Sequence, residues 1–290
     1  HEEPEPLLDQ VEALLHTYNK RFSANDDSSE LMKINKAAGL QPVTVHPELF
    51  ELISLGKWHS CQPGSHLNIA IGPLIQTWRI GFSDAKLPLP EEILPLLDII
   101  NPNAILLSEE NQSVFLKEKG MKIDLGALAK GYIADRIADF LKAENVTSAL
   151  INLGGNVLTF GPALHNPDQK WRIGIQNPKE TRNTNLMVIA IRDKSVVTSG
   201  IYERTFEIDG KTYHHIFDSQ TGYPVSSDLA SLTIISSLSV DGEIWTTRLF
   251  GSSLEHIFQE VSSQAELEAI IVDKDNHCFQ TGGIYKMRIS

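Results

Sequence analysis

The sequence predicts an α+β fold of the mixed α/β kind, because helix and strand patterns are interleaved and strands dominate the second half of the chain. Residues 7–22 carry apolar side chains at helical spacing, with polar residues on the opposite face, and predict the first helix. Residues 149–153 (ALINL) are instead a short apolar run with the length of a buried strand. No repeat, low-complexity tract or clear linker divides the chain, so residues 1–290 are expected to form a single domain of two intimate lobes, whose boundary the sequence leaves open.

The other elements follow in order from the same patterns and from turn residues. A short segment after Ser28-Ser29-Glu30 is expected to end at Asn35, and the Asp209-Gly210 pair predicts a tight hairpin. Helices are expected at residues 47–61, 69–78, 91–97, 128–142, 241–250 and 254–262. Strands are expected at residues 104–107, 113–116, 149–153, 171–175, 186–191, 195–199, 205–208, 229–235, 267–272 and 284–288.

Composition argues against some classes of function. The chain has 290 residues and a formal net charge of −12, which speaks against a nucleic-acid partner, because such proteins need a basic surface to neutralise phosphates. No apolar run is long enough to span a bilayer. Cys61 and Cys278 form no C-x-x-C pair, so a thiolate zinc site is not expected, and we expect two free or buried thiols in preference to a disulfide.

The segment from residue 197 to residue 225 gathers side chains with useful chemistry. Tyr202 and Arg204 are two residues apart and are expected to share one strand face. The return strand is expected to bring His215 beside Asp218 and the Thr221-Gly222 turn. Arg suits phosphate, and His suits proton transfer near neutral pH. A lone His is more often a hydrogen-bonded core residue, but the whole set of residues favours a functional site.

The chain resembles the ApbE family over nearly its whole length. Residues 199–204 (SGIYER) and 213–225 (YHHIFDSQTGYPV) are similar to that family's S-G-x-Y-x-R and Y-H-H-I-x-D-P-x-T-G-x-P stretches, with Ser219 where Pro is usual. Similar stretches elsewhere are residues 29–35 (SELMKIN), 72–78 (GPLIQTW), 123–132 (IDLGALAKGY, with Asp135 after it) and 149–156 (ALINLGGN).

The resemblance implies an ApbE-like flavin transferase fold that holds FAD between two lobes. It implies Mg²⁺-dependent transfer of FMN from the substrate FAD to a Thr or Ser hydroxyl of an acceptor protein, with release of AMP. His215 is the candidate base, Asp218 is a candidate for orienting it, and Arg204 is a candidate for steadying the phosphates. The residues expected to bind FAD are Ser29, Asn68, Gly126, Lys130, Asp135, Tyr202, Arg204, His215, Thr221 and Gly222.

Residues 126–131 have a physical reason to bind the pyrophosphate. They are expected to end a strand and open a helix, and such a junction offers free N–H groups and the positive end of the helix dipole to an anion. Lys130 adds a positive charge there. In the family a backbone carbonyl near Ala127 helps to bind the metal.

The metal-binding stretch departs from the family pattern A-D-x-x-x-T. Here residues 240–247 read VDGEIWTT, so aligning Asp241 puts Trp245 where Thr is expected. Aligning Glu243 restores the spacing to Thr247. We favour Asp241, with Thr246 or Thr247, if the helix start is distorted, and keep Glu243 as a close rival, since either acid is a hard oxygen ligand for Mg²⁺. In a third interpretation these residues only cap a helix.

Asn68 is a second departure, because relatives carry Asp on the flavin side at this position. The amide can donate and accept hydrogen bonds but brings no charge, so flavin contacts there are expected to differ.

Three rival functions stay open: an FAD pyrophosphatase, a non-catalytic flavin-binding protein, and a flavin reductase. The last is disfavoured because the chain has no G-x-G-x-x-G fingerprint.

The resemblance also bears on where the protein works. Members of the family usually act outside the cytoplasmic membrane and are often lipid-anchored, and the acidic, Pro-containing residues 1–6 fit a segment that follows an anchor. The chain begins after the family's first strand, which carries M-G-T. We therefore expect an extracytoplasmic protein whose membrane contact is a lipid anchor not in this chain, and whose partner is a flavin-acceptor protein.

Overall fold

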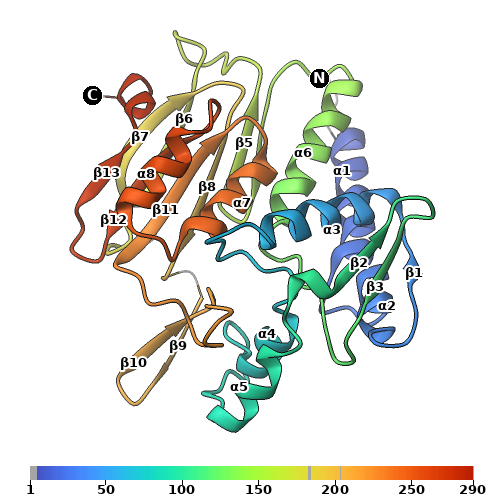
Figure 1. Cartoon of the computed structure of the whole chain (residues 1–290). Helices are drawn as coiled ribbons and strands as arrows, with labels where there is room; N and C mark the ends of the chain where they lie inside the picture. The colour runs from blue at the N-terminus through green and yellow to red at the C-terminus, as the bar shows by residue number, and fades with distance from the viewer. Residues whose placement is uncertain (1–4, 182–183, 203, 290) are drawn as a thin grey trace. The chain divides into compact units, whose positions relative to one another are not determined.

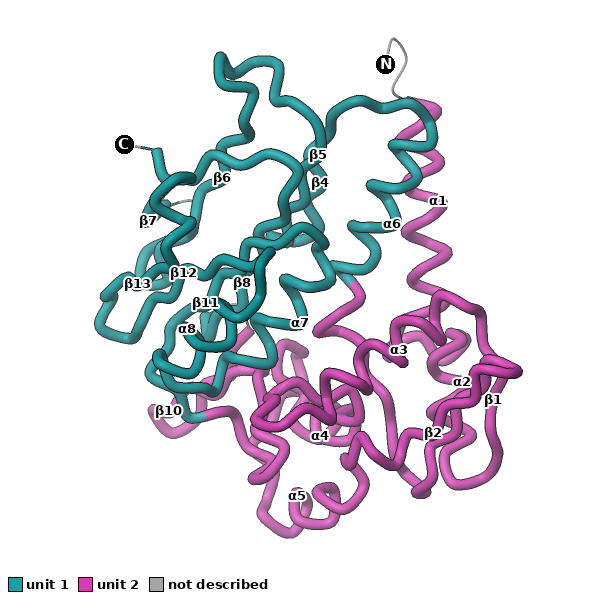
Figure 2. Tube along the Cα trace, turned by 45° about the horizontal axis from the view of Figure 1, so that its top comes forward, with its two compact units in different colours: residues 1, 130–202, 226–290 teal, residues 2–129, 203–225 magenta. Residues whose placement is uncertain are grey.

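The computed structural model describes residues 5–181, 184–202 and 204–289. The chain divides into two compact units (Figure 2). We call residues 2–129 and 203–225 the helical unit, and residues 130–202 and 226–290 the sheet unit. The mixed α+β class predicted from the sequence is confirmed by this arrangement (Figure 1).

The helical unit contains most of the early helices and two small antiparallel sheets. Strands β1, β3 and β2 form one sheet in that order, and the hairpin β9–β10 forms the other. The bounds are α1 Glu5–Phe22, α2 Glu30–Lys36, β1 Val43–Thr44, α3 Pro47–Ser60, α4 Gly72–Trp78, α5 Pro90–Leu97, a 3₁₀ turn Pro102–Ala104, β2 Ile105–Ser108, β3 Ser113–Leu116, β9 Thr205–Ile208 and β10 Lys211–His214.

The sheet unit is built on a six-stranded antiparallel sheet with the order β13-β12-β11-β8-β5-β4. Strands β6 and β7 form a separate two-stranded antiparallel ribbon, which packs against this sheet. The bounds are α6 Ala129–Ala143, β4 Ala149–Leu153, β5 Asn156–Phe160, β6 Trp171–Gln176, β7 Asn185–Ile191, β8 Ser195–Gly200, β11 Leu229–Ser236, α7 Ser239–Leu249, α8 Leu254–Ser262, β12 Glu268–Asp273, β13 Cys278–Gln280 and a 3₁₀ turn Gly282–Lys286.

The two faces of this sheet are covered by different elements. Val196 of β8 packs in one apolar cluster with residues of β6 and β7, such as Ile175 and Ile189. The next residue, Val197, points to the other face, where a Cβ on Gly242 of α7 would lie 2.6 Å from its methyl group. Because side chains alternate along a strand, the ribbon β6–β7 and the helix α7 lie on opposite faces of β8. Gly242 allows the close approach of α7.

The Asp209-Gly210 hairpin is confirmed in detail. Ile208 pairs with Lys211 across the turn, and φ is 51° at Asp209 and 74° at Gly210. Two consecutive left-handed residues define the turn type whose twist matches antiparallel strands. The hairpin therefore returns the chain to His214 and His215 as the sequence predicts.

Several predicted elements are wrong or displaced. Residues 284–288 are not a strand, because Gly282–Lys286 form a 3₁₀ turn. The Gly283 N–H donates to the Glu268 carboxylate and so holds this turn in place. Arg288 forms an isolated bridge with Ile189. The strand that residues 126–131 were expected to end is reduced to a single bridge between Lys122 and Ile71. Helix α4 begins at Gly72 instead of at Ile69, and β1 and β5 were not predicted.

Tyr202 and Arg204 do not share a strand face. Strand β8 ends at Gly200 and β9 begins at Thr205, so both residues lie in the connection between them. Glu203, which separates them, falls outside the described residues. Gly200, the last residue of β8, has no room for a side chain, because a Cβ there would lie 2.5 Å from the Tyr202 ring.

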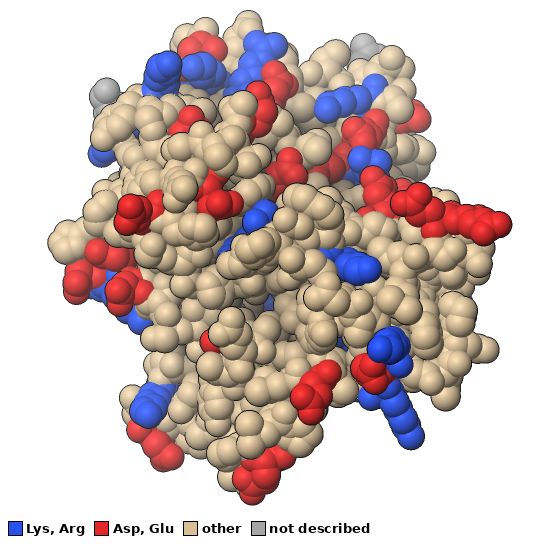
Figure 3. All heavy atoms as spheres, viewed as in Figure 1, with Lys and Arg blue, Asp and Glu red and all other residues tan. Residues whose placement is uncertain are grey.

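No helix in the described ranges has both the length and the apolar character required to cross a bilayer. On the face that Figure 3 shows, basic and acidic side chains are interspersed.

Candidate active site

An aromatic cluster supports the turn that carries Asp218, Thr221 and Gly222 in the helical unit. Trp78 is fully buried, and its indole N–H donates to the Gly222 carbonyl at 2.9 Å. Its ring packs against those of Tyr213, Phe217 and Tyr223, with centroids 5.4–5.8 Å apart. Gly222 has φ of 74°, and a Cβ there would lie 2.4 Å from Ile93. Glycine is therefore required, and the turn rests on a rigid support.

Asp218 organises this turn with both of its carboxylate oxygens. Oδ1 accepts from the Gln220 N–H at 2.8 Å, and Oδ2 accepts from the Thr221 hydroxyl at 3.2 Å. The Asp218 carbonyl accepts from the Gly222 N–H at 2.8 Å, which closes the turn. These contacts give Asp218 a role in shaping the turn; that it orients His215 stays a prediction.

The two neighbouring histidines are held by different backbone groups. The His214 ring donates from Nε2 to the Val225 carbonyl at 3.1 Å and accepts at Nδ1 from the Ile216 N–H at 3.3 Å, which fixes a neutral ring. The His215 Nδ1 lies 3.4 Å from the Arg204 carbonyl. A carbonyl can only accept, so in this contact the His215 ring donates from Nδ1. That Nε2 acts as the base stays a prediction.

Asp124 lies beside the loop expected to bind pyrophosphate and is a candidate that we did not single out from the sequence. Its Oδ1 accepts from the Gly126 N–H at 2.7 Å. Burial raises the pKa of Asp124, while the Gly126 hydrogen bond and the Arg204 charge act in the opposite direction. Asp124 therefore lies within range of the Arg204 charge and also bonds the loop expected to bind pyrophosphate. The signal for it was an Asp two residues before a glycine, a common turn pattern.

The loop before α6 offers fewer open N–H groups than we expected. Gly126 donates to Asp124, while Leu128 and Ala129 both donate to the Leu125 carbonyl. Ala127 lies half-buried in this loop. Pyrophosphate binding at residues 126–131 stays a prediction, with the helix end and Lys130 as its remaining support.

Two other residues expected to contact FAD in the helical unit have structural partners. Ser29 is fully buried and caps α2, accepting from the Met32 N–H at 3.0 Å and donating to the Ser23 carbonyl at 2.6 Å. Asn68 is 9% exposed, and its amide bonds backbone groups of Ala70 and Ile100. Contact of either residue with FAD stays a prediction.

In the sheet unit, Lys130 pairs with Glu243. The Lys130 Nζ lies 3.0 Å from Glu243 Oε1, and the Asn156 amide donates to the same oxygen at 2.9 Å. Glu243 is only 5% exposed. Among the residues that the structure describes, Oε2 of Glu243 has no hydrogen-bond or ion-pair partner, so one oxygen of a buried carboxylate is left for another ligand.

Asp135 caps helix α7 from a neighbouring helix. Its two oxygens accept from the N–H groups of Ser239 at 2.7 Å and Val240 at 2.9 Å, the first residues of α7. Burial raises the pKa of Asp135 to about 6, although these two bonds act to lower it. A Cβ on Gly131 would lie 2.5 Å from the Ser239 carbonyl, so glycine allows this close contact. Contact of Asp135 with FAD stays a prediction.

The regular geometry of helix α7 determines which faces of the helix carry Asp241 and Glu243. It is a continuous α-helix from Ser239, without the distorted start on which a pairing of Asp241 with Thr247 depends. In a regular helix, residues four apart share a face, so Glu243 and Thr247 lie together. The Asp241 carboxylate has no hydrogen-bond or ion-pair partner within the described part of the chain, and burial raises its pKa. Thr246 is fully buried and donates to the Glu243 carbonyl.

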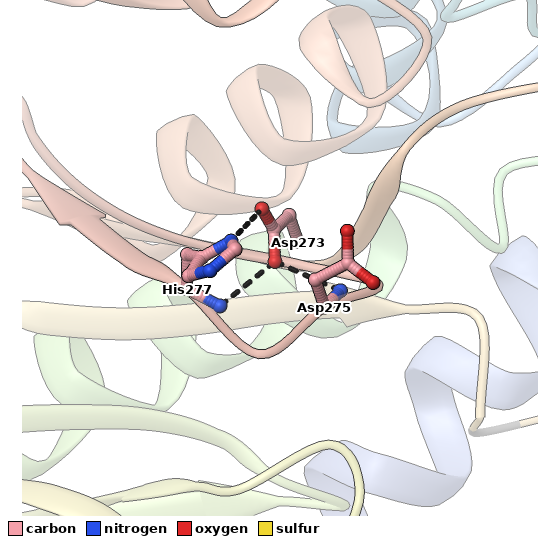
Figure 4. Close-up of side chains that lie close together, drawn as sticks. All are labelled: Asp273, Asp275 and His277. Atoms are coloured by element: carbon pink, nitrogen blue, oxygen red, sulfur yellow. Dashed lines mark hydrogen bonds and ion pairs between the residues drawn. The ribbon is translucent and has the colours of Figure 1, made fainter.

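A third group of possible metal ligands lies at the turn between β12 and β13 (Figure 4). Asp273 Oδ1 accepts from the N–H groups of Asp275 and His277, and Oδ2 lies 2.9 Å from His277 Nδ1. These bonds explain the cluster as the device that closes the hairpin. We assign no metal to it.

Solved structures identify the class of protein to which this fold belongs. The chain matches the ApbE protein of Thermotoga maritima with a TM-score of 0.90 and 25% identity, over 99% of this chain and 93% of that one. It matches the flavinyl transferase ApbE of Pseudomonas stutzeri with a TM-score of 0.83 and 23% identity, over 98% and 89% of the two chains. The fold is therefore that of the flavin transferases.

The family follows from the sequence comparison. The family model for ApbE matches residues 2–271, and the chain belongs to the ApbE family. The chain is 44% identical over 271 residues to an FAD:protein FMN transferase of Klebsiella pneumoniae (strain 342), covering 93% of this chain and 83% of that protein. It is 35% identical to the FAD:protein FMN transferase of Treponema pallidum (strain Nichols), covering 96% and 80%.

Proposed function

We propose that this chain is an FAD:protein FMN transferase, which moves FMN from FAD to a Thr or Ser hydroxyl of an acceptor protein and releases AMP. The observation that carries the proposal is 44% identity, across 93% of the chain, to a relative with that name. The helical unit supports it, because the His215 ring contacts the backbone carbonyl of Arg204, so a residue type that suits proton transfer lies close in the fold to one that suits phosphate.

The reaction is a phosphoryl-type transfer whose atoms balance without a further reactant. The acceptor hydroxyl oxygen attacks the phosphorus of the FMN half, a new P–O bond forms, and the P–O bond to AMP breaks. In the proposed mechanism Nε2 of His215 takes the hydroxyl proton. Arg204 and Lys130 neutralise phosphate charge, the main contribution that a protein makes to such transfers.

Magnesium is part of the proposal. Glu243 and Thr247 supply a carboxylate and a hydroxyl on one helix face, and Mg²⁺ prefers such hard oxygens. The open Oε2 of Glu243 supports the assignment, whereas Asp241 has the wrong helical phase for Thr247. The Ala127 carbonyl is a further proposed ligand. When bound, the ion would neutralise charge on the pyrophosphate.

Release of AMP with and without an acceptor separates this proposal from an FAD pyrophosphatase. A transferase releases AMP in proportion to acceptor that becomes flavinylated, and only slowly without it. Rapid release of AMP with water alone would favour the pyrophosphatase. FAD that stays bound and intact in the presence of Mg²⁺ and acceptor would favour a non-catalytic flavin-binding protein.

We also propose an extracytoplasmic location with a lipid anchor outside this chain. The support is the resemblance to a family that usually works there. Fractionation of cells that make the full-length protein tests it: the protein is expected with the membrane and accessible from outside the cytoplasm. Recovery in the cytoplasmic fraction would contradict it.

A further inference from the structure

Two residues at which this chain departs from the pattern of the family it resembles are in contact with each other. The Asn68 amide donates from Nδ2 to the Ser219 hydroxyl oxygen at 3.1 Å, across 151 positions of sequence and within the helical unit. Ser219 is half-buried and lies between Asp218 and the Thr221-Gly222 turn. The contact joins the segment before α4 to the turn that carries residues expected to bind FAD.

Backbone groups fix the orientation of the Asn68 amide. Its Oδ1 accepts from the Ala70 N–H at 2.8 Å, a group that can only donate. Its Nδ2 donates to the Ile100 carbonyl at 2.8 Å, a group that can only accept. The second proton of Nδ2 is the one given to Ser219. Both donors of a 9% exposed side chain are therefore used, and neither can be exchanged by rotating the amide.

We infer that Asn68 is a positioning residue for the reaction proposed above: its amide, held by Ala70 and Ile100, fixes Ser219 and with it the turn from Asp218 to Gly222. The effect on the reaction rests on the proposed function. The tether, by which we mean the hydrogen bonds from Asn68 to Ala70, Ile100 and Ser219, is observed within the helical unit whatever the function is. In this chain, where Ser219 replaces the Pro usual in the family, the tether uses both N–H groups of an amide at position 68, in place of the Asp that relatives carry. A carboxylate there would place an oxygen against the Ile100 carbonyl, where no proton is shared unless the acid is protonated.

The amide requirement gives a pH signature. In N68D, the carboxylate must be protonated to donate to Ile100, so the turn is restored at low pH and loosened as pH rises. FAD affinity of N68D, divided by that of wild type at each pH, is expected to fall between pH 5 and pH 8. Dividing by wild type removes the titration of other groups, such as His215. If the bonds of residue 68 had no influence on the turn and on FAD binding, the ratio would be constant.

Ser219→Ala is the milder companion variant, and Gln220→Ala is its matched control. Gln220 is an exposed neighbour in the same turn, and its side chain is not part of the tether. We expect Ser219→Ala to weaken FAD binding about fivefold, the factor that corresponds to one hydrogen bond. We expect Gln220→Ala to bind FAD as wild type does, and N68D/S219A to be less impaired than the product of the two single effects.

Amide hydrogen exchange without FAD tests the tether apart from the function. The amides of Gln220, Gly222 and Tyr223 are expected to exchange faster in Ser219→Ala than in wild type or Gln220→Ala. If wild type bound FAD but released no AMP to an acceptor, the proposed function would fail and the tether would still be judged by exchange. Unchanged exchange in Ser219→Ala, or a pH-independent N68D ratio, would overturn the inference.

Discussion

At the scale of single residues, Asp135 is a buried acid of α6 whose carboxylate caps the first turn of α7. Its folded-state pKa is raised from 3.8 to about 6, chiefly by burial. Between these values the folded protein holds a proton that the unfolded chain has released, so stability falls as pH rises through this window. The shift corresponds to about 3 kcal/mol at most.

Asp135→Asn is expected to remove this pH dependence. The variant loses one cap acceptor to α7 and is less stable than wild type at pH 4, but its deficit shrinks as pH rises to 6. Urea unfolding of both proteins at several pH values measures the difference. Parallel curves for the two proteins would show that Asp135 keeps an ordinary pKa in the fold.

His215 and His214 form a natural pair for testing the base. His215→Ala is expected to slow FMN transfer by about a hundred- to ten-thousand-fold, the usual contribution of general-base catalysis, while leaving FAD affinity nearly intact. His214 bonds Val225 and Ile216, so His214→Ala is expected to act through stability. Single-turnover rates at saturating FAD and Mg²⁺ make the comparison. Near wild-type transfer by His215→Ala would leave His215 a positioning residue only.

At the scale of elements, helix α7 separates the two candidate metal acids. Because Glu243 and Thr247 share a helix face, Glu243→Gln is expected to abolish transfer while FAD binding is weakened much less. Asp241→Asn keeps the size of the side chain and is the matched control. Transfer measured over a range of Mg²⁺ concentrations decides between them. Loss of Mg²⁺ dependence in Asp241→Asn alone would restore Asp241 as the ligand.

Elements with a local signal were predicted well. Helix α1 and the Asp209-Gly210 hairpin follow from apolar periodicity and turn chemistry, which act over a few residues. The 3₁₀ turn at Gly282–Lys286 was missed because its apolar residues resemble a strand, and the decisive bond comes from Glu268. Local patterns do not record such distant partners.

In the candidate site, too, residues in recognisable local motifs were predicted, whereas contacts between distant segments were not. The resemblance located His215, Asp218 and the Thr221-Gly222 turn, but not the bonds that hold them. Asn35 binds both the N–H and the carbonyl of Ile123, at 2.7 and 3.0 Å, across 88 positions of sequence. The influence of the Arg204 charge on Asp124 and the contact between Asn68 and Ser219 are equally non-local. These contacts depend on which segments the fold brings together, so no periodicity could reveal them.

At the scale of the whole molecule, a bound substrate must stabilise the folded chain. FAD at a hundred times its dissociation constant is expected to raise the free energy of unfolding by about 2.7 kcal/mol, because it binds the folded state alone. Chemical unfolding with and without FAD measures this effect, and AMP at the same concentration is the control. Equal stabilisation by AMP would place the binding energy outside the flavin half.

Transfer of FMN to a hydroxyl group of another protein can be observed on the acceptor itself. The most direct measurement is intact mass spectrometry of an acceptor protein with an exposed Thr or Ser, after incubation with this protein, FAD and Mg²⁺. We expect the acceptor to gain the mass of one FMN less water, on a single Thr or Ser, in equal amount to the AMP released. We expect His215→Ala to slow this gain greatly. An acceptor of unchanged mass, in a reaction where FAD is consumed, would contradict the proposed transfer.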